Sequence, residues 1–439
     1  MSVALEAVHT QLLTVDWADA PQRVYAAVEF AERSEMPWGA WRRGNQMFLI
    51  VGGELNAYDP LSLLSPPTEI STDKLDEPNA IEIAAAVPSR IISRRFSSRS
   101  ETQLNSSEDV WSGWGEGGLL WVPAFSLCFD LSKSLGVIAY CAQLDNDDSI
   151  SSLFTVIKQP QPILRGEPPP LASLSPLESL EAYPSWRTRV EEVKRRCHQG
   201  ELSKVVFARS WTKNAPDGYQ WSGARMWRKC LERAAHGEIP FALSPRQGQC
   251  FVGVSPERLF EIKDRRLNTH ALAGTRALSD PSDSVETERL FKDLTSSSKD
   301  REEHEIVVSL IEEALSETCV EVNIGDRRLS RAGSLVHLET PIEATLRQEV
   351  SPQVMMERLH PTPALGGAPR ADALALIKET EPMQRGAYAA PWMWESAGGE
   401  ACAVVGIRSA LLSPQEVRVF AGAGIVGRSD PQSEWLETR

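Results

Sequence analysis

The sequence predicts an α/β fold in which strands and helices alternate over much of the chain. Runs rich in β-branched and aromatic residues, such as residues 47–51 and 203–209, are typical of strands. Apolar residues at helical spacing over residues 186–197 predict an amphipathic helix. With 439 residues, 42% hydrophobic and 24% charged, the chain has an ordinary globular composition, and large α/β enzymes of this length often form one domain.

Composition also narrows the classes of function and the compartment. The net charge of −14 argues against nucleic acid or an anionic membrane as the main partner. Seven scattered cysteines without CxxC spacing argue against a disulfide framework or a zinc site and favour a reducing compartment. We find no basic segment followed by an apolar run at the N-terminus and no apolar window of ~18 residues. We therefore expect a cytoplasmic protein.

Residues 1–160 carry few chemical signals. Strands are predicted at residues 47–51 and 137–142, each followed by a turn-forming loop. Residues 88–109 are rich in serine and arginine, but no aromatic residues are interleaved among the basic ones. We therefore predict a surface loop there rather than a phosphate site.

A glycine motif and a proline-rich segment follow. Gly113, Gly115 and Gly118 fit GxGxxG, yet a strand-like run comes next, whereas the dinucleotide fingerprint requires a helix. The motif is therefore predicted to be a turn. Residues 159–176 are predicted to be a connector that lies on the surface, ahead of the helix at residues 186–197.

The stretch AGAGIVGRSDPQSEWLE, residues 421–437, predicts a strand that enters a glycine loop and then a helix. Asp430 is the expected N-cap, and Pro431 takes the first helical position. Glu434 and Glu437 are three residues apart and project from one face of this helix. Two carboxylates beside a bare glycine backbone suit Mg²⁺. The alternative is a solvated helix start, where acidic residues are favoured anyway.

Two strand regions carry candidate proton-transfer groups. Lys204 shares a strand face with apolar residues, which would lower the pKa of its amine and allow it to act as a base or nucleophile. The alternative is a lysine that extends to solvent. Glu257 follows Pro256 between two short strands, where a partly desolvated carboxyl could act as an acid. The alternative is that Glu257 is a carboxylate in a turn with no catalytic role.

A long helix is predicted over residues 298–315. Val307, Leu310 and Ala314 fall on one stripe, and stepping back four residues from Val307 leads to Glu303. A carboxylate on an apolar stripe must be paired or must bind a cation. Glu303 is therefore either a metal ligand or half of a buried salt bridge.

Further polar groups stand at strand ends. Gly274 and Thr275 could form a nest for an oxyanion or carboxylate. His337 could orient a substrate hydroxyl or be a satisfied core histidine. Residues 385–388 are predicted to begin a strand, and Arg408, beside an apolar strand, is predicted to face a carboxylate. Without HExxH, P-loop or GxSxG motifs, this set suits metal-assisted addition–elimination on a small carboxylate.

Eight motifs, in order, resemble those of the chorismate-binding enzymes over about residues 185–437: SKVVFAR, GVSPERL, LAGTR, KDREEHE, HLETP, HPTPALGGAPR, VVGIRSA and AGAGIVGRSDPQSEWLE. Within this family the chain is most similar to isochorismate synthases. Ala364 stands where anthranilate synthases usually carry threonine, and Lys204 where they tend to carry glutamine. The resemblance implies one large α/β domain over residues 1–439 with two stacked, antiparallel-rich sheets flanked by helices. Residues 185–437 would be its catalytic core and residues 1–160 its variable part.

The resemblance also implies roles for individual residues. Lys204 would activate water to attack C2 of chorismate, and Glu257 would protonate the departing C4 hydroxyl. Glu303 and Glu437 would bind Mg²⁺, with Glu434 nearby, and Mg²⁺ would hold the ring carboxylate. Pocket residues would be Gly274, Thr275, His337, Ala364, Tyr388, Arg408 and Gly422, of which Arg408, Tyr388 and the Gly422 backbone would hold the enolpyruvyl carboxylate.

The resemblance thus leads us to expect a Mg²⁺-dependent isomerase (hydroxymutase) that converts chorismate to isochorismate, acts as a monomer and serves menaquinone, phylloquinone or siderophore biosynthesis. The alternatives are a salicylate synthase, the large subunit of an aminodeoxychorismate synthase, and a non-catalytic chorismate-binding subunit. The family also normally carries a lysine four positions after Glu437, beyond Arg439 at the end of this sequence.

Overall fold

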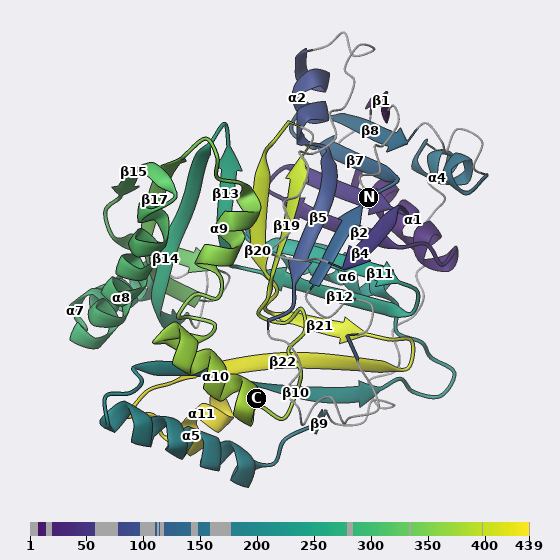
Figure 1. Ribbon diagram of the computed structural model, residues 1–439. Helices are drawn as coiled ribbons and strands as arrows, with labels where there is room; N and C mark the ends of the chain where they lie inside the picture. Colours follow the sequence, from purple (N-terminus) through teal and green to yellow (C-terminus); the bar gives the residue numbers. More distant parts are fainter. Residues whose placement is uncertain are drawn as a thin grey trace.

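The computed structural model describes residues 8–14, 20–57, 78–96, 110–111, 114, 118–141, 148–158, 177–278, 284–332, 335–396 and 398–438. Within these residues the chain forms two large antiparallel β-sheets with helices around them (Figure 1). The predicted fold class is thereby confirmed. The proline-rich segment at residues 159–176, together with Gly113 and Gly115, lies outside the described residues.

The larger sheet has 12 strands. Its order is β1 (Val8–Thr14), β8 (Leu135–Cys141), β7 (Phe125–Asp130), β3 (Gln46–Val51), β2 (Trp38–Arg43), β11 (Ile239–Arg246), β12 (Gln249–Ser255), β21 (Ser409–Leu412), β22 (Glu416–Ile425), β10 (Lys204–Asn214) and β18 (Gly367–Ala368), with β9 (Glu178–Ser179) beside β10. Strands β3, β8 and β10 confirm the predictions from the alternating and β-branched runs.

The smaller sheet has 10 strands. Its order is β15 (Cys319–Ile324), β17 (Leu335–Leu346), β14 (Arg266–Ala277), β13 (Arg258–Lys263), β20 (Ala401–Val405), β19 (Pro391–Ser396), β5 (Pro88–Arg94), β6 (Gly118–Val122) and β4 (Glu54–Ala57), with β16 (Arg328–Ala332) beside β17. Both sheets therefore combine strands from the first 160 residues with strands from the later part of the chain. Strand β6 begins at Gly118, as expected for a glycine turn that leads into a strand.

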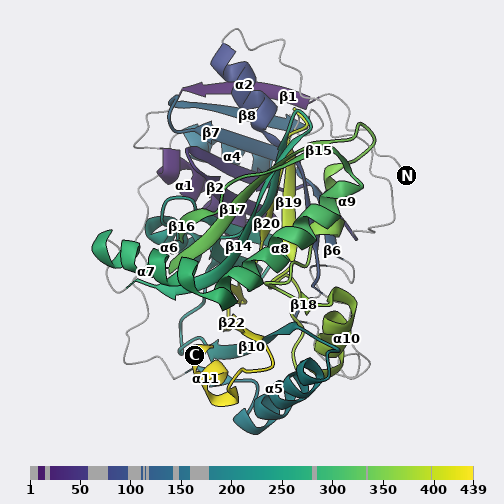
Figure 2. The same ribbon diagram turned by 90° about the vertical axis from the view of Figure 1, so that its left-hand side faces the viewer.

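Helices lie along both sheets (Figures 1 and 2). They are α1 (Ala20–Arg33), α2 (Pro78–Ala86), α4 (Asp148–Lys158), α5 (Tyr183–His198), α6 (Gly223–Arg233), α7 (Ser284–Ser296), α8 (Ser298–Ser316), α9 (Pro352–Leu359), α10 (Arg370–Thr380) and α11 (Pro431–Glu437). Helices α7 and α8 pack on β14 and β17, whereas α5 and α11 pack together beside β10 and β22. No helix among the described residues is long and apolar enough to span a membrane.

Aromatic side chains from both sheets form the centre of the core. Trp41, Phe48 and Phe241 come from the larger sheet, Trp392 and Trp394 from the smaller one, and each is exposed by 3% or less. The ring of Trp41 lies 5.7 Å from that of Trp392 and 5.3 Å from that of Trp394. Large aromatic side chains bury much apolar surface, so this cluster is what holds the two sheets face to face.

The prediction of a surface loop over residues 88–109 is wrong for the first part of this segment. Pro88–Arg94 form β5, which pairs with β19 and buries Ile91 and Ile92. Arg90 is paired inside the fold, since it donates to the buried carboxylate of Glu395. Residues 97–109 lie outside the described part of the chain.

Two further local predictions are wrong. Residues 385–388 form a turn in which the Tyr388 amide donates to the Arg385 carbonyl at 2.9 Å, and the next strand begins only at Pro391. The left-handed backbone of Gly386, with φ of +55°, explains why the chain turns here. On α8, Leu310 is 37% exposed and does not belong to the buried stripe.

Candidate active site

Lys204 begins β10, and its side chain crosses the neighbouring strand β22. Val206 lies opposite Gly424 and Ala208 opposite Gly422 in the antiparallel register. A Cβ atom at Gly424 would lie 2.8 Å from Lys204 Cε and 3.4 Å from Nζ. The absence of a side chain at Gly424 therefore makes room for the lysine, which is half-buried.

Tyr388 lies over the same glycine strand. Its ring stacks on Phe420 at 4.9 Å with an interplanar angle of 16°. Its hydroxyl would be 3.3 Å from a Cβ at Gly422. Burial raises the pKa of Tyr388 to about 12, so the phenol keeps its proton and remains a donor at neutral pH.

The loop that carries Ala364 runs along the side of β10 that faces away from β22. The Val206 amide donates to the Gly366 carbonyl at 2.9 Å, and Ala368 pairs with Lys204. Gly367 has φ of +139°, and a Cβ there would lie 2.2 Å from the Lys204 carbonyl oxygen, so only glycine fits. The half-buried Ala364 is thereby held close to the start of β10.

Glu257 occupies the turn between β12 and β13. Its amide donates to Ser255 Oγ at 3.2 Å, and its carbonyl accepts from the Val405 amide at 3.0 Å. Burial raises the pKa of the Glu257 carboxyl to about 7. A carboxyl of this kind retains its proton near neutral pH and can act as a general acid.

Arg408 follows β20 in the left-handed region, with φ of +49°. Its Nη1 donates to Glu238 Oε1 at 2.7 Å, which confirms the prediction that it faces a carboxylate. The Glu238 side chain is only 7% exposed, whereas that of Arg408 is 37% exposed. A guanidinium has five N–H donors, so one bond to Glu238 leaves donors for a second anion.

Gly274 and Thr275 lie at an irregularity of β14, opposite His337 on β17. Thr275 pairs with His337, and Gly274, with φ of +70°, interrupts the register. Burial and the charge of Arg408 lower the pKa of His337 to about 4, so its imidazole is neutral at neutral pH. The side chain of Thr275 lies outside the described atoms.

These groups form a connected line at the junction of the two sheets. Tyr388 reaches Gly422 of the larger sheet, and the next residue, Ala389, donates through its amide to the Gly406 carbonyl at 2.9 Å, just before Arg408. Arg408 acts electrostatically on His337. These contacts link Tyr388 with Gly422, and Arg408 with His337, which pairs with Thr275 beside Gly274. Lys204 lies beside Gly424, two residues from Gly422, and the loop of Ala364 runs along the same strand β10. Glu257 lies beside the end of β20.

The predicted metal ligands lie on two helices. Asp430 caps α11 by accepting from the Ser433 amide at 2.8 Å, as predicted, and Glu434 is half-buried while Glu437 is exposed. The backbone of Glu303 belongs to α8, but its side chain lies outside the described atoms. Among the side chains that the structure describes, no three histidine, cysteine or acidic groups gather as a metal site. Carboxylate oxygens are the donor type that Mg²⁺ prefers, so Glu434 and Glu437 on α11 fit the ion by the chemistry of their donors.

The buried stripe of α8 differs from the predicted one. His304, Val307, Ile311 and Leu315 are all exposed by 7% or less. The stripe therefore includes His304, three residues before Val307, and leaves out Leu310. His304 Nε2 lies 2.7 Å from Thr340 Oγ1 of β17, a contact that sequence spacing alone did not indicate.

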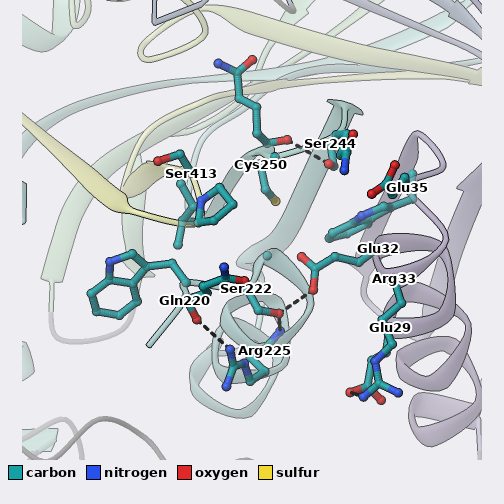
Figure 3. Close-up of a pocket in the computed structure, with 18 of the residues that line it drawn as sticks. Glu29, Glu32, Arg33, Glu35, Gln220, Ser222, Arg225, Ser244, Cys250 and Ser413 are labelled. Atoms are coloured by element: carbon teal, nitrogen blue, oxygen red, sulfur yellow. Dashed lines mark hydrogen bonds and ion pairs between the residues drawn. The ribbon is translucent and has the colours of Figure 1, made fainter. Parts of the chain in front are cut away.

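A separate pocket of about 550 Å³ lies between α1, α6 and the β11–β12 hairpin (Figure 3). None of the predicted site residues lines it. Two of its acidic groups have partners, since Glu32 accepts from Ser222 Oγ at 2.5 Å and Glu29 from Arg33 at 2.7 Å.

Sequence reasoning missed several supporting residues. Glu238 partners Arg408 although it lies 170 positions away, and Phe420 supports the Tyr388 ring. The buried pair of Glu381 and Arg385 fixes the turn before Tyr388. Only this last pair had a visible signal, because its members are four residues apart.

The two antiparallel sheets and the turns between their strands thus carry Lys204, the Glu257 carboxyl with its raised pKa, and Arg408. The model of the chorismate binding enzyme family matches residues 76–439. The chain belongs to this family.

Several relatives have related sequences. The salicylate biosynthesis isochorismate synthase of Pseudomonas aeruginosa is 38% identical over 281 residues, which are 63% of this chain and 57% of the relative. Isochorismate synthase MenF of Bacillus subtilis is 36% identical over 257 residues, 58% of this chain and 53% of the relative. The matches thus span somewhat more than half the length of these relatives.

Solved structures share the fold. MenF, the menaquinone-specific isochorismate synthase from Escherichia coli, has a TM-score of 0.74 at 22% identity, covering 98% of this chain and 92% of that one. Anthranilate synthase component I from Streptococcus pneumoniae has a TM-score of 0.69 at 20% identity, covering 100% of this chain and 92% of that one. The same architecture therefore occurs both in an isochorismate synthase and in an anthranilate synthase component.

Proposed function

We propose that the protein is an isochorismate synthase, a Mg²⁺-dependent isomerase that adds water at C2 of chorismate and removes the C4 hydroxyl. The observation that carries the proposal is Glu257, whose pKa of about 7 makes it an acid at neutral pH. The isochorismate synthases among the relatives support the same reaction class.

In this mechanism Lys204 accepts a proton from a water molecule while the water oxygen forms a bond to C2. Both double bonds of the ring shift by one position, the C4–O bond breaks, and Glu257 donates its proton to the departing oxygen, which leaves as water. One water enters and one leaves, so the product is an isomer. Solvent returns the proton from Lys204 to Glu257 before the next turnover, because base and acid must each recover their starting state.

The substrate has two carboxylates, and each needs a positive or donor group. Arg408 and the Tyr388 hydroxyl would hold the enolpyruvyl carboxylate, with Gly422 allowing close approach of the backbone. The imidazole of His337, which is neutral at neutral pH, would accept a hydrogen bond from a hydroxyl or donate one to it. Glu303, Glu434 and Glu437 would hold Mg²⁺, which when bound would neutralise the ring carboxylate.

Product analysis tests this proposal directly. The purified chain is incubated with chorismate and Mg²⁺, with and without ammonium, and products are separated and identified by mass. Isochorismate that accumulates only with Mg²⁺ and regardless of ammonium is the expected result. Salicylate with pyruvate would identify a salicylate synthase, and an aminated product would identify the amine-adding branch. Chorismate that binds without turnover would identify a non-catalytic subunit.

A further inference from the structure

Arg209 is a buried cation on the face of β10 opposite Lys204. Residues alternate across a strand, so the odd positions Phe207 and Arg209 face the layer formed by α5 and α11. Arg209 is only 1% exposed. A buried charge is costly unless it is well partnered, so its contacts show what it is for.

These contacts converge on the last turn of α11. Nη1 of Arg209 donates to the Trp435 carbonyl at 3.1 Å and to Thr438 Oγ1 at 2.6 Å. The guanidinium carbon lies 3.1 Å from the centre of the Trp435 ring. A cation at the C-terminal carbonyls of a helix and over an indole face is stabilised by both. Nη2 also donates to Ser179 Oγ at 3.2 Å, which ties this arrangement to β9.

Helix α11 depends on such external contacts. It has seven residues, and a helix of this length is not stable by itself in water. Glu434 directly precedes Trp435, and Glu437 directly precedes Thr438. Each glutamate is therefore the chain neighbour of a residue that Arg209 contacts. A shift of Arg209 would move both carboxylates together.

We propose that Arg209 is a positioning residue that fixes Glu434 and Glu437 for a divalent cation. The inference rests on the proposed function for the assignment of these glutamates as Mg²⁺ ligands. Arginine rather than lysine is required because its planar fork reaches Trp435 and Thr438 through one nitrogen and Ser179 through the other. A single ammonium group cannot span these acceptors in that geometry.

The test compares Arg209→Lys with the matched control Arg189→Lys. Arg189 is 5% exposed in the same layer, its guanidinium carbon lies 4.4 Å from the Phe207 ring, and it pairs with Glu181. Binding of Mn²⁺, used in place of Mg²⁺, is measured by electron paramagnetic resonance on the full chain. Amide exchange over residues 431–438 and the Mg²⁺ dependence of chorismate turnover are measured in parallel.

We expect Arg209→Lys to weaken Mn²⁺ binding about tenfold or more and to raise the Mg²⁺ concentration for half-maximal turnover by a similar factor. At saturating Mg²⁺, kcat should stay within about twofold of wild type, because the ligands themselves remain. Amides of α11 should exchange faster. Arg189→Lys should change the Mn²⁺ affinity less than about twofold.

Three results would overturn the inference: unchanged Mn²⁺ affinity in Arg209→Lys, equal losses in both variants, or a wild-type chain that does not bind Mn²⁺. A wild-type chain that binds Mn²⁺ but forms no isochorismate would instead refute the proposed function. In that case the Mn²⁺ affinities of the two variants still decide the role of Arg209.

Discussion

The side chain of Lys204 lies across the backbone of Gly424, so that a methyl group at position 424 would stand 2.8 Å from Lys204 Cε. This contact joins the first residue of β10 to the glycine-rich end of β22. It gives a physical reason for a glycine on this strand, because any side chain would occupy the volume that the lysine uses. The placement of the proposed base thus depends on a residue with no chemistry of its own.

Gly424→Ala should therefore reduce activity more than stability. The clash involves the far end of a flexible side chain, which can move aside, so unfolding free energy should change by less than about 0.5 kcal/mol. Displacement of the amine by about 1 Å should lower kcat by roughly 10- to 100-fold. Isochorismate formation and urea unfolding measure the two effects.

The control for Gly424→Ala is the same change in a Lys204→Ala background. Lys204→Ala should itself abolish turnover while Mg²⁺-dependent chorismate binding stays nearly intact. In this background the added methyl group meets no lysine, so the chorismate binding that Lys204→Ala retains should not change. Equal turnover of Gly424→Ala and wild type would show that the lysine position does not limit the reaction.

Glu257→Gln should remove the proton donor and cut kcat by about 100-fold or more. In the wild type, kcat/KM should fall as pH rises above about 7, because only the protonated carboxyl can donate and its pKa is about 7. A profile in which kcat/KM stays flat from pH 6 to 8.5 would contradict this role.

The raised pKa of the Glu257 carboxyl also predicts how the stability of the protein depends on pH. Its pKa in the folded state is raised from 4.5 to about 7, so the native state binds more protons than the unfolded state between these values. Wild-type stability should therefore fall as pH rises through this window. Glu257→Gln, which has no charge to bury, should show a flatter dependence in urea unfolding from pH 5 to 8. An equal slope in both proteins would contradict the raised pKa.

Tyr388→Phe should weaken substrate binding without disturbing the fold. The ring keeps its stack on Phe420, so unfolding free energy should change by less than about 1 kcal/mol, and only the hydroxyl near Gly422 is lost. Loss of one hydrogen bond to a carboxylate should raise KM for chorismate about 10-fold with little change in kcat. Steady-state kinetics separate the two constants, and a fall in kcat alone would place the hydroxyl at the reacting atoms instead.

Local sequence patterns were enough to predict the strands around Lys204 and the capped helix at Asp430, because strand propensity and capping act over a few residues. These patterns failed where contacts between residues far apart in the sequence determine the local structure. Arg90 appeared to belong to an exposed loop because Glu395, its buried partner, lies 305 positions away. Leu310 appeared buried because helical periodicity allows steps of three or four, and only the packing of His304 on Thr340 selects between them. The pairing of Arg408 with Glu238 likewise has no local signal.

Glu303→Gln should raise the Mg²⁺ concentration needed for half-maximal turnover by about 10- to 100-fold, because a neutral amide is a weaker ligand for a hard cation than a carboxylate. The matched control is Glu305→Gln on the same helix, whose side chain is 67% exposed and pairs with Arg327 at 3.3 Å. Glutamine at position 305 removes one negative charge from α8 without touching a proposed ligand, so its Mg²⁺ titration should match that of wild type. If both variants shift the titration equally, the general negative charge of the helix attracts the ion. If neither does, Glu303 serves a structural pairing and the cation must be held from α11 alone.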